Sequence, residues 1–221
     1  MIINQEAVFK VCSNVRNNID QKISFKSLLA KIRREFHFYN IDLYIRSNRK
    51  TSLSPDEFYV NAYYDYEDEL DNEIPIEVLI YHNFDKNILW NRKQITDLLI
   101  QIYDAVIHEF QHQHQSRRRC YKDFWPHSQI VLQYLSDPDE IDAYAISIAV
   151  ELCRSLGRER SLRHLSKFKL LSKFRLQHNL VSPNLFAFVR VFDQVDEQVL
   201  RRLMKKVFKH LKKIDTDLIF M

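Results

Sequence analysis

The spacing of apolar residues near the start of the chain predicts two helices. The first is expected over Glu6–Asn18 and the second over Ser24–Phe38, where Ser24 is a suitable N-cap. Apolar residues recur in the second segment at intervals of three or four, which places them on one face of a helix. They are Phe25, Leu28, Leu29, Ile32 and Phe36. We expect this face to pack against a core.

Three strands are expected after the second helix. Ile41, Leu43 and Ile45 alternate with other residues at the period of a half-buried strand. Phe58–Tyr64 is rich in aromatic residues, and Ile76–Tyr81 is rich in aliphatic residues. The three strands are predicted to form a small antiparallel sheet. Because the chain has a single glycine, a turn-dense all-β fold is disfavoured.

A long helix is expected over Gln94–Gln115. Its most apolar stripe consists of Ile95, Leu99, Ile102, Val106 and Phe110. At about 100° per residue, His108 and His112 fall off this stripe, on the flank that carries Gln101 and Asp104. Histidines that filled a core would lie on the stripe. These two are therefore expected to face a cleft, as ligands do.

The C-terminal third is predicted to be helical. Asp137 and Pro138 suit the N-cap and first position of a helix that ends near Leu156, and its apolar composition predicts burial. Three more helices are expected, over Arg158–Gln177, Asn184–Phe192 and Asp196–Lys213. Gly157 is the best candidate boundary. The sequence thus predicts an α+β fold, with one domain over 1–156 and a basic helical extension over 157–221 packed on it.

Charge is distributed unevenly over the 221 residues, although the net charge is only +4. Residues 52–110 contain 13 acidic and 3 basic side chains, whereas residues 157–213 contain 15 basic and 4 acidic ones, a difference of +11. This contrast indicates a polyanion partner such as a nucleic acid, attraction between the two halves, or solvated helix faces. A single glycine excludes glycine-rich nucleotide-binding loops.

No targeting or membrane segment is evident. Met1–Asp20 lacks an apolar core of signal-peptide length, and no later segment approaches the roughly 18 to 20 uncharged apolar residues of a membrane span. Cys12, Cys120 and Cys153 are widely separated and form no metal-binding pair, which fits a reducing compartment. We expect a cytoplasmic protein that does not enter a membrane.

The pentad over 108–112 has the form HExxH. Two histidines four residues apart on a helix lie on one face, about one turn apart, so His108 and His112 can bind the same zinc ion. Glu109 between them is placed to act as general base on a zinc-bound water. The alternative is a solvated helix face that binds no metal.

A catalytic zinc usually has three protein ligands and a water, so a third ligand is required. The metzincin continuation is absent, because Gln115 and Arg118 occupy its glycine and third histidine positions. Glu140, near the start of the buried helix, is the best candidate. Two alternatives stay open: Glu140 as the capping-box partner of Asp137, and His127 as the third ligand.

With these residues the chain resembles the zincin-like metallopeptidases, in particular the small gluzincin-like group that includes phage- and bacterium-encoded members. The HExxH motif and the segment Glu140–Ala145, which is similar to the glutamate helix of that group, carry the resemblance. It implies that His108, His112 and Glu140 bind Zn²⁺ and that Glu109 is the general base. The implied activity is hydrolysis of peptide bonds in a protein substrate.

One position departs from that group. Where many gluzincins have an acid four residues past the ligand glutamate, this chain has Tyr144, so Asp142 or Asp104 would have to orient a histidine. The candidates for stabilising the oxyanion are His127, Tyr121, Tyr134 and Tyr144. Ile76–Tyr81 is expected to form the cleft edge on which an extended substrate adds as another strand.

Two other functions compete with a peptidase. The first is a nucleic-acid-associated protein in which the zincin-like site is inactive, as the basic C-terminal third suggests. The second is an assembly protein in which zinc is purely structural. A fourth ligand such as Asp139 or His127 would favour that structural role.

Overall fold

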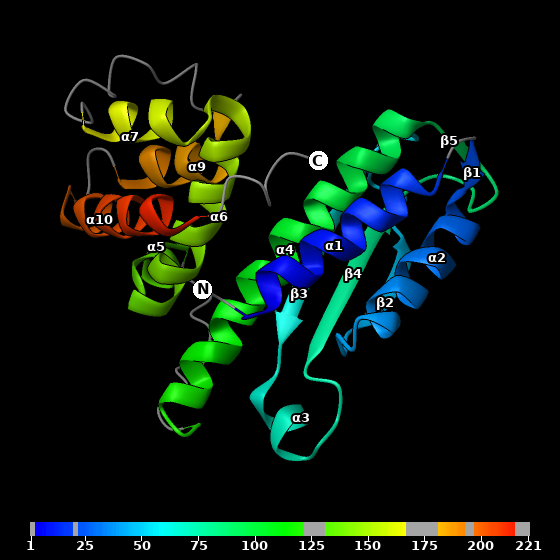
Figure 1. Cartoon of the computed structure of the whole chain (residues 1–221), viewed down its shortest axis with the longest axis horizontal. Helices are drawn as coiled ribbons and strands as arrows, with labels where there is room; N and C mark the ends of the chain where they lie inside the picture. Colours follow the sequence, from blue (N-terminus) through cyan, green and yellow to red (C-terminus); the bar gives the residue numbers. More distant parts are fainter. Residues whose placement is uncertain (1–2, 20–21, 122–130, 167–180, 193–196, 215–221) are drawn as a thin grey trace. The chain divides into compact units, whose positions relative to one another are not determined.

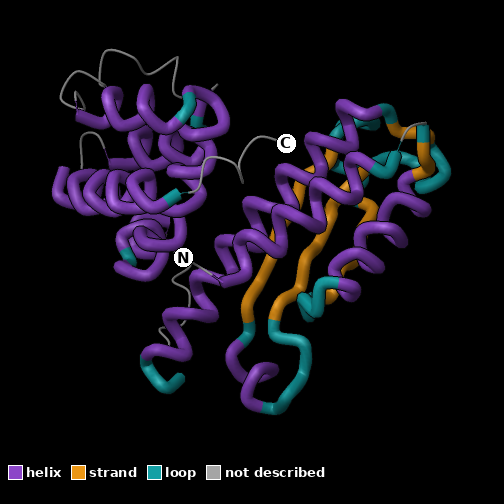
Figure 2. The backbone as a smooth tube through the Cα atoms, in the orientation of Figure 1, coloured by secondary structure: helices purple, strands orange, loops and turns teal. Residues whose placement is uncertain are grey.

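The computed structural model describes residues 3–19, 22–121, 131–166, 181–192 and 197–214. The chain divides into two compact units, an N-terminal unit over Ile2–Ser116 and a C-terminal unit over Arg117–Phe220 (Figure 1). Within the described ranges, strands occur only in the N-terminal unit and helices predominate in both (Figure 2). The predicted mixture of helix and a small sheet is therefore confirmed. No helix in these ranges combines the length and apolar content needed to cross a lipid bilayer.

The N-terminal unit holds a three-stranded sheet, a smaller two-stranded sheet and helices packed beside them. Its elements are α1 (Ile3–Asn17), β1 (Ile23–Ser24), α2 (Phe25–Phe38), β2 (Tyr44–Arg49), β3 (Phe58–Tyr64), α3 (Tyr66–Leu70), β4 (Ile76–His82), β5 (Leu89–Trp90) and α4 (Arg92–Arg118). Ser24 is the N-cap of α2, as predicted, and its hydroxyl accepts the Ser27 N–H. β1 pairs with β5, and the larger sheet has the order β2-β4-β3.

The larger sheet is mixed, which corrects the prediction of an antiparallel sheet. β3 runs antiparallel to β4, but β2 runs parallel to it, with Ile45 opposite Val78. Alternation of apolar residues identifies the buried face of a strand but neither its direction nor its neighbour, so the sequence could not reveal the parallel pair. The first strand also begins later than expected, at Tyr44 and not at Ile41.

β4 is the central strand, so the prediction that Ile76–Tyr81 forms an open cleft edge was wrong. Both sides of β4 pair with neighbours, and no free row of backbone groups is left to which an extended peptide could add. The edges of this sheet are β2 and β3. The Val60 N–H of β3 donates to Gln101 Oε1 of α4 at 3.1 Å, so α4 is anchored to an edge strand.

Side-chain hydrogen bonds also join the helices of this unit to one another. Gln5 Nε2 of α1 donates to the Tyr103 hydroxyl of α4 at 3.0 Å. Asn14 Nδ2 of α1 donates to the hydroxyl of Tyr39, the C-cap residue of α2, at 2.9 Å. Figure 1 shows α1 lying along α4, in agreement with these contacts. The long helix is thus fixed by α1 on one side and by β3 on another.

His82, at the end of β4, lies in a cluster of aromatic rings. Its side chain is almost fully buried against Phe25 and Phe84, and Trp90 packs on both phenylalanines. His82 Nδ1–H donates to the Phe84 carbonyl at 3.1 Å, and its Nε2 is buried without a hydrogen-bond partner among the described residues. Burial lowers the pKa of His82, the hydrogen bond to Phe84 opposes this, and two nearby basic side chains lower it further.

The C-terminal unit is built around one buried helix. Its elements are α5 (Val131–Ser136), α6 (Pro138–Leu156), α7 (Arg158–Ser166), α9 (Pro183–Phe192) and α10 (Glu197–Lys213). α6 contacts each of the other four. Asp137 is its N-cap and Pro138 its first residue, as predicted, and it ends at the expected Leu156. Gly157, with φ of 76°, lies between α6 and α7 inside this unit. The division into domains 1–156 and 157–221 stays a prediction.

A buried glutamate joins α6 to the start of α9. Glu151 accepts hydrogen bonds from the Ser182 hydroxyl and, at 2.8 Å, from Asn184 Nδ2. Ser182 Oγ in turn accepts the Leu185 N–H at 3.2 Å, so it caps the helix that Glu151 holds. The carboxylate is compensated by these donors, as a buried charge requires.

The buried His82 predicts a loss of stability at acidic pH. Its folded-state pKa is lowered, so the unfolded chain takes up a proton that the folded chain resists. The free energy of unfolding should therefore fall as the pH drops below about 6.5, by at most about 1.4 kcal/mol per pH unit from this group. Urea unfolding between about pH 7.5 and pH 5.5 should show a shallower decline in His82→Gln. Equal slopes in the two proteins would contradict the assignment.

Candidate metal centre

The HExxH residues lie in the second half of α4, a helix of 27 residues. The helix starts with a reciprocal pair of hydrogen bonds: Gln94 N–H donates to Asn91 Oδ1 at 3.1 Å, and Asn91 N–H donates to Gln94 Oε1 at 3.0 Å. This is a capping box, which defines the residue at which the helix starts. The predicted helix is confirmed and extends a few residues beyond Gln94–Gln115 at each end.

His108 and His112 direct their imidazoles toward one another. Their Nε2 atoms are 3.1 Å apart, and the ring centroids are 4.8 Å apart with the ring planes at 71°. Two nitrogens that bind one tetrahedral zinc at 2.0 to 2.1 Å are separated by about 3.3 Å. The pair therefore already has nearly the separation that a shared zinc ion requires.

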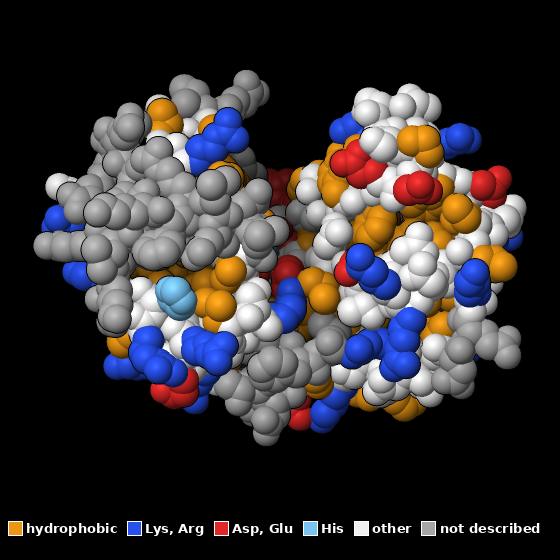
Figure 3. Space-filling model, turned by 90° about the horizontal axis from the view of Figure 1, so that it is seen from above, with side chains coloured by type: hydrophobic (Ala, Val, Ile, Leu, Met, Phe, Trp, Pro, Cys, Tyr) orange, Lys and Arg blue, Asp and Glu red, His pale blue; other side chains and the backbone are white. Residues whose placement is uncertain are grey.

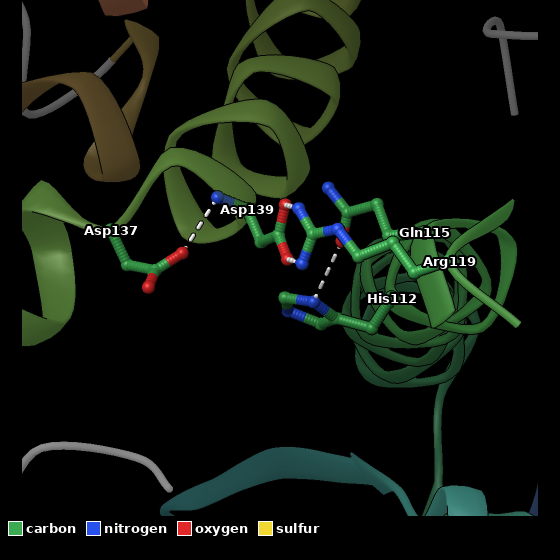
Figure 4. Close-up of polar contacts among 5 residues, drawn as sticks. All are labelled: His112, Gln115, Arg119, Asp137 and Asp139. Carbon is green, nitrogen blue, oxygen red and sulfur yellow. Dashed lines mark hydrogen bonds and ion pairs between the residues drawn. The ribbon is translucent and has the colours of Figure 1, made fainter. Parts of the chain in front are cut away.

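Gln115 orients the second histidine of the motif. Its Oε1 accepts the His112 Nδ1–H at 3.1 Å, as Figure 4 shows. A proton on Nδ1 leaves the lone pair of the imidazole on Nε2, the atom that faces His108. Contacts of this kind fix the tautomer and the ring orientation of metal-binding histidines. Sequence reasoning missed this role, although the i, i+3 spacing on one helix face could have revealed it.

Burial differs sharply between the polar residues of this helix. Glu109 is 9% exposed and His112 6%, whereas His108 is partly exposed and His114 is fully on the surface. A carboxylate beside two imidazoles, with only one of the rings open to solvent, suits a site that is entered from one side. His114 is exposed, and its position two residues after His112 places it about 200° around the helix from that residue.

Glu140 lies in the C-terminal unit, in the first turn of α6, and is 3% exposed. It is not the capping-box partner of Asp137. The Asp137 N–H donates instead to the Tyr134 carbonyl at 3.1 Å, and Asp137 Oδ1 accepts the Asp139 N–H at 2.7 Å.

Tyr134 and Tyr144 are both candidates for stabilising an oxyanion, and Tyr134 contacts both Tyr144 and Glu140 within this unit. The rings of the two tyrosines meet edge to face, with centroids 6.5 Å apart. Burial raises the pKa of Tyr134 well above its ordinary value, and its contacts with Tyr144 and Glu140 raise it further. The hydroxyl therefore stays protonated and donates to the Glu140 carboxylate. Tyr144 also packs against Phe188 of α9, at 5.2 Å between centroids.

Asp142, expected to orient a histidine, contacts α10. Lys206 Nζ lies 2.9 Å from Asp142 Oδ1, and His210 Nε2 lies 3.5 Å from the same oxygen. Burial would raise the pKa of Asp142, but the hydrogen bonds and charges of His210 and Lys206 outweigh it and hold this pKa well below its ordinary range. The carboxylate therefore stays ionised and joins α6 to α10. Its orienting role at a metal site stays a prediction.

Asp139 forms an ion pair that the sequence did not reveal. Both of its carboxylate oxygens accept N–H groups of the Arg119 guanidinium, as Figure 4 shows. This pairing disfavours Asp139 as the fourth ligand of a closed structural zinc site. His127 lies outside the described residues. Tyr121 is described, is half-buried and lies in the turn that follows α4.

Comparison with known proteins found no match among family models, curated proteins or solved structures. The chemistry of the candidate centre is therefore inferred from its own side chains. Those are the paired imidazoles and the buried Glu109 of α4, and the buried Glu140 of α6.

Proposed function

We propose that this protein is a zinc-dependent metallopeptidase of the zincin-like kind. The observation that carries the proposal is the 3.1 Å separation of the His108 and His112 Nε2 atoms, with the buried Glu109 in the same helical turn. An HExxH pentad on a helix presents two imidazoles on one face with a carboxylate beside them, which is the arrangement that zinc-dependent metallopeptidases use. The resemblance of the HExxH and glutamate segments to gluzincin-like peptidases points the same way.

Glu140 is the proposed third ligand. Among the described residues, His108, His112 and Glu140 form the group of ligand-type side chains that could hold a metal ion. Two imidazoles and one carboxylate are a donor set of catalytic zinc sites and leave a fourth position open. The two histidines belong to the N-terminal unit and the glutamate to the C-terminal unit.

The proposed chemistry divides between the metal and the protein. A bound zinc ion would lower the pKa of a water and polarise the carbonyl of the peptide bond. Glu109 would accept the proton of the attacking water and pass it to the departing amine. The protonated Tyr134 hydroxyl would keep Glu140 oriented through its hydrogen bond. Gln115 would keep the lone pair of His112 Nε2 directed at the ion.

Replacing Glu109 with Gln should separate catalysis from metal binding. Gln has nearly the same size but cannot accept the proton, so hydrolysis of a library of internally quenched peptides should fall by about 10²- to 10⁴-fold. Zinc content, measured by mass spectrometry of the reconstituted protein, should stay stoichiometric. His112→Ala should lose both the zinc and the activity.

His114→Ala is the matched control for the histidine variant. It removes an imidazole from the exposed side of the same helix and should leave zinc content and hydrolysis unchanged. The proposal fails if the wild-type protein binds no zinc after reconstitution, or if His112→Ala binds as much zinc as the wild type.

Gln115→Ala should weaken zinc binding by about 10- to 100-fold, because an outer contact that orients a ligand contributes that much. Competition with a chromogenic chelator would measure the change. Gln113→Ala is the control, since Gln113 is also buried on this helix but no His112 contact involves it. Equal affinities in the two variants would show that Gln115 has no role in orienting His112.

The third ligand can be identified by comparing Glu140→Gln with His127→Gln. Loss of a direct ligand should weaken zinc binding by more than about 100-fold, the upper end of the effect of an outer contact. It should also abolish the rise in melting temperature that zinc causes by binding the folded state. We expect this result for Glu140→Gln only. The same result in His127→Gln alone would transfer the role to His127.

A further inference from the structure

α10 presents a continuous positively charged side to solvent. Its basic residues are Arg201, Arg202, Lys205, Lys206, Lys209, Lys212 and Lys213, and no acidic residue occurs between Gln198 and Lys213. Projected at about 100° per residue, the seven cations fall within an arc of roughly 140°. All except Lys206 are exposed. We call this arc the α10 cationic face.

The opposite side of α10 is packed into the C-terminal unit. Val199, Leu203, Val207 and Leu211 are buried, and Lys206 forms an ion pair with Asp142 of α6. The helix is therefore held in one orientation by its apolar side. The cations of the α10 cationic face therefore lie together on one surface before any partner binds, because the helix is already folded.

α7 extends the positive surface beyond α10. Arg160 and Arg163 of α7 are exposed, and Arg158 Nη2 donates to the Lys212 carbonyl at 2.8 Å, which joins the two helices. A surface hollow is lined by Leu156, Gly157, Arg158, Glu159, Arg160 and Arg163. Figure 3 shows Lys and Arg side chains at the surface of both units. Three guanidinium groups around a hollow form a suitable site for a phosphate.

We propose that the α10 cationic face and the α7 arginines bind the sugar–phosphate backbone of a nucleic acid. The partner must be strongly anionic, because the surface offers cations along several turns of helix and only Glu159 as an exposed acid on α7. An anionic membrane fits less well. A helix that lies in a membrane surface inserts its apolar side between lipids, and that side of α10 is buried in the protein.

Binding through phosphates predicts a definite dependence on salt. Each cation that neutralises a phosphate adds about 0.9 to the slope of log affinity against log salt concentration. The triple variant Arg202→Gln, Lys205→Gln, Lys209→Gln should therefore lower the magnitude of that slope by about 2.7. Affinity at 100 mM salt should drop at least about tenfold. The probes are a 30-base-pair DNA duplex and a 30-nucleotide RNA. Their binding is measured by fluorescence anisotropy at salt concentrations from 50 to 200 mM NaCl.

A matched triple variant, Lys26→Gln, Arg34→Gln, Lys93→Gln, removes the same charge from exposed positions of the N-terminal unit. It should retain the wild-type slope and affinity. The proposal is overturned if neither nucleic acid binds at 50 mM salt, or if both variants weaken binding equally. It is also overturned if the protein binds phosphatidylglycerol vesicles and not nucleic acid. None of the six substituted residues belongs to the candidate metal centre. The outcome of this experiment is therefore independent of the zinc-binding and hydrolysis tests of the proposed function.

Discussion

Two imidazoles one turn apart on a helix point in a fixed direction only if that helix is held against rotation, and in this protein contacts on two sides hold α4 in this way. The capping box at Asn91 sets where the helix begins, and contacts with α1 and β3 prevent it from rotating. His108 and His112 lie one turn apart by helix geometry, and Gln115 directs the ring of His112. The candidate metal centre depends on this chain of hydrogen bonds more than on any property of the histidines alone.

α6 supplies a second constraint, because it places acidic side chains in a largely apolar helix. Glu151 is compensated by Ser182 and Asn184, and Asp142 by Lys206 and His210. Each of these carboxylates joins α6 to a different helix, so burial of charge also determines how the C-terminal unit packs. One partner of Glu140 in the same unit is the neutral Tyr134 hydroxyl, a weaker donor than a cation.

Local patterns predicted most of the secondary structure because they act over a few residues. Ser24 and Asp137 were identified as caps from side-chain type alone, and the apolar stripe of α4 located the helix that carries the motif. The sheet was predicted less well. The parallel pairing of β2 with β4 and the central place of β4 join segments about 30 residues apart. No local pattern encodes which strand edge a distant segment will meet.

The sequence by itself determined the residue types and spacing of the candidate centre: an HExxH pentad on a helix, and a glutamate at the start of a buried one. Helical periodicity alone brings i and i+4 side chains together, so this much needs no tertiary contact. Only the tertiary structure decided which neighbours those residues have. Arg119 pairs with Asp139, Asp142 turns to α10, and Glu140 is not a helix cap. Such pairings depend on how whole helices pack, because a carboxylate accepts hydrogen bonds from whichever donors the neighbouring helices bring within reach.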